Sequence, residues 1–370
     1  MDIIISIIAF ALLLGILIFV HELGHFMVAK WCGMRVDQFS IGFPPNIFRK
    51  RRGETEYVIG VVPFGGYVKI RGENSEEEVE DDPRSFDRKP VWQRIAVILA
   101  GITMNVLFAF VVLTVAFSVG FSSFAQDLTK EPGATVVTSR VVIVRVEESA
   151  PAKAAGIRTG DLLKTVSSLD GSEQYQIFTT SDLQQRTRTF QEAGVQRIAV
   201  DIERNGEPLR IETGLAPVGS AALGVLIQPY NAVRVPVWRA PVVATKEIGA
   251  IISVTWTALA DFGTRLFTKA ELDPNVSGPL GIYQATAVAT KMGFEQVVFL
   301  AVALSLNLAL LNVLPIPALD GGRFVFLLSE AIFRKRVIAR KIEQAVTAFS
   351  FFALMGLFVV LTVRDVFNLF

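Results

Sequence analysis

The stretch IIISIIAFALLLGILIFVHELGH, residues 3–25, decides the fold of this chain. An apolar run without a charged residue ends in an H-E-L-G-H motif, and its His21 and His25 are the only histidines in the chain. Residues four apart in a helix share one face, so both imidazoles point to the same side, with Glu22 beside them. That arrangement is typical of a zinc site. Ionisable groups at the end of a membrane span are costly and usually indicate function.

The composition indicates a membrane protein with soluble parts. Of the 370 residues, 51% are hydrophobic and the mean hydropathy is +0.47, which is too apolar for an ordinary soluble protein. With 19% charged residues, the chain is also too polar to lie wholly within a bilayer. A net charge of +1 argues against nucleic acid as a partner. The single cysteine, Cys32, excludes an internal disulfide and a thiolate zinc site, and we interpret it as a packing residue.

Four segments are long enough to cross a bilayer, which takes roughly 20 residues. No positively charged region precedes the first one and no small-residue cleavage site follows it, so we expect a retained span rather than a signal peptide. A fifth apolar segment, residues 248–260, is shorter and follows Lys246 and Glu247, which favours a surface or interfacial helix. The four expected spans are residues 3–30, 95–121, 294–314 and 342–363.

Basic clusters predict the side of the membrane that each loop faces. Residues 49–52 and 334–336 carry Lys and Arg in the two loops that would lie on one side. The positive-inside rule makes both loops cytoplasmic, with both termini and residues 122–293 on the external, periplasmic side. A solvated basic loop explains either cluster alone, so the topology rests on their agreement. If residues 248–260 also crossed the membrane, the number of spans would be odd and the two termini would lie on opposite sides.

A second motif could complete the metal site. After the third span the chain reads NVLPIPALDGG, residues 312–322, and its two prolines forbid a continued regular helix. Irregular backbone at membrane depth is tolerated where it is buried in protein or lines a wet cavity. Asp320 follows this break at about the depth of the histidine pair, which makes it the natural third ligand. An ordinary turn is the alternative, since Asp-Gly-Gly after prolines is common turn chemistry.

The two motifs together resemble those of the site-2 protease family of intramembrane zinc metalloproteases. The resemblance implies that His21, His25 and Asp320 hold Zn²⁺ and that Glu22 is the general base. It also implies single-span transmembrane proteins as substrates, within the bilayer of a bacterial inner (plasma) membrane. Four further pieces resemble the bacterial branch that cuts anti-sigma factors, the regulator-of-sigma-E protease type: residues 39–42, residues 62–69, Ala100-Gly101 with Asn105, and residues 277–282.

The same resemblance suggests which residues contact the substrate. Residues 57–70 alternate and match the family's membrane-associated β-hairpin, so Gly65, Gly66 and Tyr67 could offer a strand edge to an unwound substrate. A plain cytoplasmic hairpin is equally compatible with this segment. Asn312 resembles an asparagine that contacts the substrate backbone, although an interhelical hydrogen bond would also explain it. We interpret Asn105 as a helix-packing residue.

Two further segments lie outside the spans, an acidic run and a region that resembles a known peptide-binding domain. The acidic run at residues 73–82 is interpreted as a solvated loop rather than a second metal site. Residues 141–146, the Gly-rich turns within 149–171 and a hairpin around Asn205-Gly206 resemble a single PDZ domain. PDZ domains often capture peptides by strand addition, but a steric gate is nearly as plausible here.

The predicted fold is a polytopic α-helical membrane protein with four transmembrane helices, a membrane-associated β-hairpin and an inserted α+β PDZ-like domain. The predicted function is zinc-dependent intramembrane proteolysis of anti-sigma factors, other single-span proteins or signal-peptide remnants. A non-catalytic scaffold would predict a degraded metal motif, and a divalent-metal transporter would predict polar residues through several spans. Proteases that trim prenylated proteins usually take a Glu or His as third ligand. The expected divisions are residues 1–121, 122–236, 237–293 and 294–370.

Overall fold

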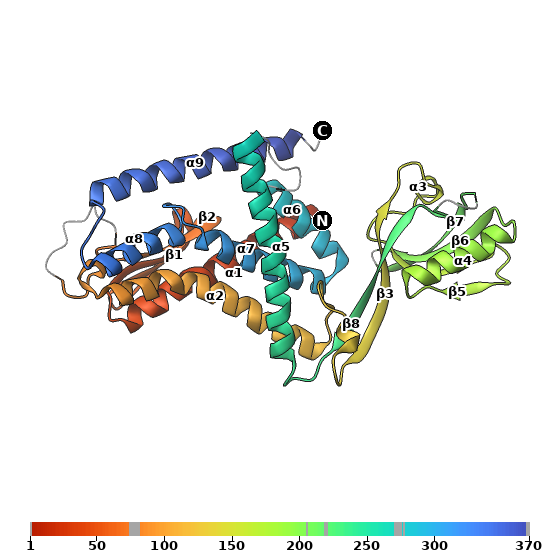
Figure 1. Cartoon of the computed structure of the whole chain (residues 1–370), viewed down its shortest axis with the longest axis horizontal. Coiled ribbons are helices and arrows are strands. Elements are labelled where there is room, and N and C mark those ends of the chain that lie inside the picture. The colour runs from red at the N-terminus through yellow and green to blue at the C-terminus, as the bar shows by residue number, and fades with distance from the viewer. Residues whose placement is uncertain are drawn as a thin grey trace. The chain divides into compact units, whose positions relative to one another are not determined.

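The computed structural model describes residues 2–73, 82–204, 206–217, 221–269, 276 and 278–367. The chain forms two compact units, which we call the helical unit and the sheet unit (Figure 1). The helical unit comprises Met1–Leu113 and Ala244–Phe370, and the sheet unit comprises Thr114–Val243. Parts of three predicted segments lie outside the described residues: the acidic run at 74–81, Asn205 in the predicted hairpin turn, and Ser277.

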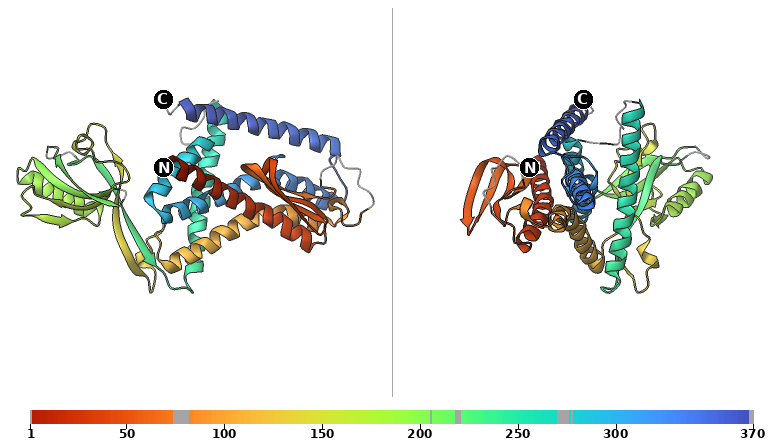
Figure 2. Two further views of the ribbon diagram at one scale, coloured as in Figure 1. Left: turned by 180° about the vertical axis from the view of Figure 1, so that it is seen from behind. Right: turned by 60° about the vertical axis from the view of Figure 1, so that its left-hand side comes forward.

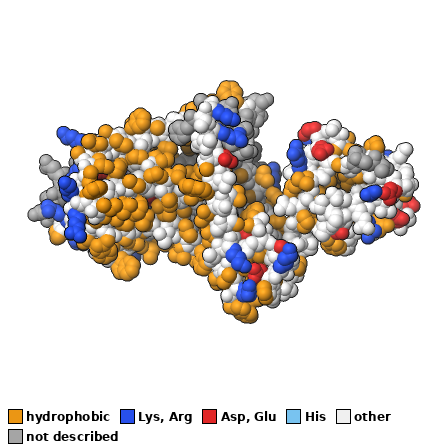
Figure 3. Space-filling view, viewed as in Figure 1, with side chains coloured by type: hydrophobic (Ala, Val, Ile, Leu, Met, Phe, Trp, Pro, Cys, Tyr) orange, Lys and Arg blue, Asp and Glu red, His pale blue; other side chains and the backbone are white. Residues whose placement is uncertain are grey.

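Long apolar helices make this chain a multi-pass membrane protein. Among the described residues, five helices are long and apolar enough to cross a bilayer. Apolar side chains cover much of the visible face of the helical unit, and Lys and Arg gather at its ends (Figure 3). The five helices are α1 (Asp2–Trp31), α2 (Val91–Val119), α5 (Ala240–Lys269), α7 (Phe294–Val313) and α9 (Arg340–Phe367).

Helix α5 differs from the short helix expected at residues 248–260. It spans 30 residues, and Ala240–Arg265 has the length and hydropathy of a membrane span. The expected boundary at Lys246 and Glu247 was wrong, because Glu247 is fully buried within the helix instead of ending it. Helix propensity of Lys and Glu is high, so a charged pair does not interrupt a helix that can bury it.

Two shorter helices follow backbone breaks in the same unit. Helix α6 (Pro279–Met292) starts with proline at its first position, where the missing N–H is not needed. The buried carboxylate of Asp365 on α9 accepts hydrogen bonds from the backbone N–H groups of Gly278 (2.8 Å) and Gly281 (3.2 Å). A side chain from the last helix therefore caps α6. Helix α8 (Asp320–Phe333) follows the proline pair after α7.

Two long bent strands form the sheet of the helical unit, β1 (Val36–Arg52) and β2 (Thr55–Ile70). Residues 38–41 of β1 pair with residues 56–59 of β2 on one side and with residues 66–69 on the other. The two strands thus make four antiparallel segments, in the order 46–52, 55–60, 36–43 and 66–70. Segment 66–70 is an edge in the described part of the chain, and β2 packs against α1 (Figure 2).

The sheet unit is a six-stranded antiparallel sheet with two helices, α3 (Pro151–Ala154) and α4 (Thr180–Glu192). The strand order is β7-β6-β4-β3-β8, with β5 paired to β4. The predicted hairpin is present as β6 and β7, and the strand expected at 141–146 is longer. The bounds are β3 (Thr135–Val146), β4 (Leu162–Ser167), β5 (Gln174–Gln176), β6 (Arg197–Arg204), β7 (Glu207–Gly214) and β8 (Val225–Arg234).

The sheet unit has a core of Val, Ile and Leu side chains. A buried ion pair and a helix cap add polar contacts around this core. The Asp161 side chain is only 2% exposed, and the Arg204 guanidinium donates to both of its oxygens at 2.7 Å. At the start of α4, Thr179 and Asp182 form a capping box, in which each side chain accepts from the other's backbone N–H.

Candidate metal centre

The two histidines of α1 lie side by side on one face of the helix. Each is 8% exposed, and their Nε2 atoms are 3.2 Å apart. The helix is uninterrupted through this region because neither Pro nor a polar cluster breaks the run, so the i, i+4 spacing brings His21 and His25 together.

Asp320 reaches the same point from the other end of the chain. Its Oδ2 atom lies 3.1 Å from His21 Nε2 and 3.3 Å from His25 Nε2. Asp320 is the first residue of α8 rather than part of an isolated turn. The two glycines that follow allow this. A Cβ on Gly321 would lie 2.3 Å from the carbonyl oxygen of Val313 at the end of α7, and a Cβ on Gly322 would lie 2.3 Å from that of Ile316 in the preceding loop.

The three atoms fit a zinc ion. Zinc binds imidazole nitrogen and carboxylate oxygen at about 2.0–2.2 Å with tetrahedral geometry, which separates neighbouring ligand atoms by about 3.3–3.6 Å. The separations in the structure are 3.1, 3.2 and 3.3 Å. Asp320 Oδ2 is buried without a hydrogen-bond partner among the described residues, which a bound ion would supply. Two imidazoles and one carboxylate leave a coordination position open, as catalytic zinc sites do.

Side chains and backbone around the histidines orient their rings. His25 Nδ1 lies 2.8 Å from the carbonyl oxygen of Val97 on α2, so it donates and leaves Nε2 for a metal. The amide Nδ2 of Asn105 lies 3.3 Å from His21 Nδ1. A metal on Nε2 leaves the hydrogen on Nδ1, and the amide must then present Oδ1 as the acceptor. That oxygen has no hydrogen-bond partner in the described part of the chain.

Helices α1 and α2 approach each other through glycine. A Cβ on Gly101 would lie 2.3 Å from His25 Nε2 and 2.7 Å from the His21 Cε1 atom. A Cβ on Gly24 would lie 2.4 Å from the carbonyl oxygen of Ala100. Real Cβ contacts are essentially never under 3.0 Å, so the missing side chains make room for both imidazoles and for the helix crossing.

A cavity of about 470 Å³ opens at the three candidate ligands. Glu22 lines it beside them, as do Gly66 and Tyr67 of the edge segment of β2. Gly65 is not among the described residues that line the cavity, and a Cβ there would lie 2.1 Å from the Phe43 ring. The predicted substrate-contacting hairpin therefore borders the metal site with its edge, through only part of the predicted residues.

The remaining predicted residue, Asn312, is buried near the end of α7, and its Nδ2 atom lies 3.5 Å from His21 Nε2. Sequence reasoning assigned Asn105 to packing and missed its contact with His21. A signal was available, because Asn105 follows Gly101 by four residues and therefore shares its helix face. The sequence analysis did not single out Arg323, and it assigned Glu73 to a solvated acidic loop. Both residues instead line the metal cavity, where the Glu73 side chain is only 13% exposed and pairs with Arg323.

Comparison with known proteins gives a consistent result. The sequence model described as Peptidase family M50 matches residues 9–357. A protein of Clostridium perfringens is 35% identical over 97% of this chain and 98% of its own length. Proteins of Fusobacterium nucleatum (32%; 97% of both chains) and a Nostoc species (30%; 97% of this chain and 95% of the other) are similarly close. All three are named as candidate zinc metalloproteases.

Proposed function

This chain belongs to peptidase family M50, the site-2 protease family, and we propose that it is a zinc endopeptidase that cuts transmembrane segments of single-span membrane proteins. Metalloprotease activity and zinc as the cofactor follow from the family. The observation that carries the proposal is the triangle of His21 Nε2, His25 Nε2 and Asp320 Oδ2, which lies in a cavity that Glu22 also lines.

We propose that His21, His25 and Asp320 hold the zinc and that Glu22 moves the protons. When bound, zinc would supply Lewis acidity, which makes a water molecule nucleophilic near neutral pH and polarises the scissile carbonyl. The Glu22 carboxylate accepts the proton of the attacking water and then delivers it to the leaving amine. We propose that the Asn312 amide holds a substrate backbone group, which is supported by the 3.5 Å between its Nδ2 atom and His21 Nε2.

The edge segment of β2 supports an extended substrate. Peptide bonds in a transmembrane helix are shielded by their own hydrogen bonds, so a substrate must unwind before it is cut. Gly66 and Tyr67 border the metal cavity on a strand edge, and such an edge can satisfy the freed backbone groups by strand addition. We propose that the unwound segment pairs with residues 66–70.

The decisive experiment uses membranes that contain the wild type or Glu22→Gln, and a tagged single-span substrate truncated on its outer side. Wild type should produce a cleavage product that a zinc chelator abolishes. Glu22→Gln should give none while it retains zinc by elemental analysis, and Glu148→Gln, an exposed position in the sheet unit, should behave as wild type. Equal cleavage by wild type and Glu22→Gln would remove Glu22 as the base. Absence of zinc from the wild type would favour a non-catalytic scaffold.

We further propose that four helices cross the bacterial inner membrane, with both termini and the sheet unit on the periplasmic side. The basic loops support this topology by the positive-inside rule. Helix α5 has the lowest hydropathy of the five candidate spans, 1.3 against 2.0 or more, which supports an interfacial position for it. Single cysteines introduced at both termini of Cys32→Ala should react with a membrane-impermeant thiol reagent from the same side. Labelling from opposite sides would instead show that α5 crosses.

We propose that the sheet unit is a PDZ-like domain that screens or docks substrates. Helix α4 lies beside the edge strand β8, and the Thr180 hydroxyl donates to the carbonyl oxygen of Ile227 at 3.4 Å. PDZ domains bind an extended peptide along an edge strand that has a helix beside it. A size filter predicts that adding a folded external domain to the model substrate abolishes cleavage. Docking predicts that cleavage depends on the sequence of the substrate's external end.

A further inference from the structure

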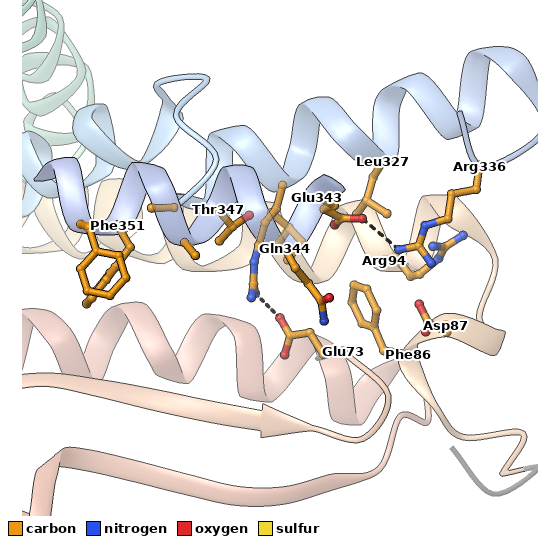
Figure 4. Close-up of a pocket in the computed structure, with 15 residues that line it drawn as sticks. Glu73, Phe86, Asp87, Arg94, Leu327, Arg336, Glu343, Gln344, Thr347 and Phe351 are labelled. Atoms are coloured by element: carbon orange, nitrogen blue, oxygen red, sulfur yellow. Dashed lines mark hydrogen bonds and ion pairs between the residues drawn. The ribbon is translucent and has the colours of Figure 1, made fainter. Parts of the chain in front are cut away.

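A second cavity, of about 440 Å³, lies beside the metal cavity in the helical unit. Figure 4 shows α9 carrying Gln344, Thr347 and Phe351 on one side of it, with Phe86 and Glu73 opposite. Its walls combine apolar and charged groups. The apolar part is formed by Phe86, Leu327 and Phe351, and the charged part by Asp87, Arg336 and Glu343.

The two cavities adjoin each other. Glu73, Ile98, Ala318 and Arg323 line both of them. Arg323 stands one helical turn after Asp320, and its Nη1 donates to Glu73 Oε1 at 2.5 Å. This ion pair therefore lies at the boundary between the metal cavity and the second cavity.

The edge strand ends close to that boundary. Residues 66–70 of β2 border the metal cavity, and Glu73 follows them by three residues. Five residues of extended chain span about 16 Å at about 3.3 Å per residue. A peptide paired along this edge would thus extend through the metal cavity to the turn that carries Glu73, which also lines the second cavity.

We infer, on the basis of the proposed protease function, that the second cavity binds the part of the unwound substrate on the Glu73 side of the scissile bond. It takes a large apolar side chain against Phe86, Leu327 and Phe351, and the charged rim meets polar residues further along the substrate. Apolar residues that give way to charged ones are the chemistry of a transmembrane segment where it leaves the bilayer. An extended polypeptide of that composition is the ligand that the walls fit.

The inference can be tested by cross-linking, because Cys32 is the only cysteine to be removed. In Cys32→Ala with Glu22→Gln, which should bind substrate without cutting it, Ala348→Cys places a thiol in the second cavity. Ala345→Cys is the matched control, one turn earlier on α9 and not among the described residues that line the cavity. Lys69→Cys reports on the edge strand. Model substrates carry single cysteines in turn on both sides of the scissile bond.

We expect Ala348→Cys to form disulfides with substrate positions on one side of the scissile bond only, several residues from it. Cross-links from Lys69→Cys without any from Ala348→Cys above the Ala345→Cys level would overturn the inference and leave the protease function intact. Cross-links from Lys69→Cys to positions on both sides should centre on the scissile bond. A wild type that neither holds zinc nor cuts any substrate would instead reject the proposed function, and the inference with it.

Cavity filling gives an independent measurement. Ala348→Trp should lower kcat/KM by about 10- to 100-fold for substrates with a large apolar residue at the cross-linked position, and replacing that residue with alanine should restore cleavage. Ala345→Trp should leave both substrates unaffected, and both variants should retain zinc. Equal kcat/KM for Ala348→Trp and wild type would overturn the inference. If the cavity instead holds a lipid chain, Ala348→Trp should lower kcat/KM equally for both substrates. That result would also overturn the inference.

Discussion

Gly101→Ala should abolish most zinc binding without weakening the helix. The added Cβ would lie 2.3 Å from His25 Nε2 and 2.7 Å from His21 Cε1, whereas ordinary contacts begin at 3.4 Å. The histidine nitrogen must therefore move by about 1 Å, well beyond the roughly 0.2 Å tolerance of metal–ligand distances. Alanine also has the higher helix propensity, by about 1 kcal/mol, so any loss of metal cannot be attributed to a destabilised α2.

The expected magnitude is a loss in zinc affinity of about 100-fold or more. Mutations that merely disturb the groups orienting a ligand already reduce affinity by about 10- to 100-fold. A hundredfold loss corresponds to about 2.8 kcal/mol. Zinc affinity would be measured on the purified protein by competition with a chromophoric chelator, and helix content by circular dichroism.

Gly15→Ala is the matched control, because no heavy atom lies within 4 Å of the position its Cβ would take on α1. It should bind zinc as tightly as the wild type. Wild-type zinc affinity in Gly101→Ala, with unchanged helix content, would refute the proposal that the imidazoles beside Gly101 are the metal ligands.

Three other changes test separate contacts. Asn105→Leu should weaken zinc binding by about 10- to 100-fold in the same competition assay, because a ring nitrogen loses its amide partner; unchanged affinity would return this residue to a packing role. Arg204→Met should lower the free energy of unfolding of the sheet unit by about 3 kcal/mol, since it strands the buried Asp161 carboxylate, and pulse proteolysis in urea on the full chain would measure it. The hydrogen bond from Thr179 holds the pKa of Asp182 below its usual range. Its contribution is therefore present above about pH 5 and lost as pH falls below about 4, so Asp182→Asn should lower the unfolding temperature at pH 7 and match the wild type in acid.

Local periodicity explains what could be predicted from the sequence. The positions of four long helices follow from apolar runs of bilayer length, and the face shared by His21 and His25 follows from the i, i+4 rule. The motif around Asp320 was informative because two prolines inside an apolar stretch leave few structures at membrane depth. In both cases the signal lies within a few neighbouring residues.

What could not be predicted depends on contacts between distant segments. Lys246 and Glu247 looked like a helix boundary because they are charged. Glu247 is nevertheless buried within α5, and its burial is decided by tertiary packing that the local sequence does not reveal. The double pairing of residues 38–41 with both halves of β2 leaves no trace in the alternation of either strand. Asn105 resembled a packing residue, since its partner lies 84 positions away in the sequence.

The three proposed metal ligands come from opposite ends of the chain, which has a consequence for biosynthesis. Asp320 emerges roughly 15 to 60 s after His25 at a synthesis rate of about 5–20 residues per second. Two histidines alone make an incomplete site, so the chain should acquire zinc only when its last quarter has been inserted. A ribosome-stalled chain that ends before α8 should therefore carry no zinc by elemental analysis. The order of translation would in this way keep the half-made enzyme from cutting other nascent membrane proteins at the site of insertion.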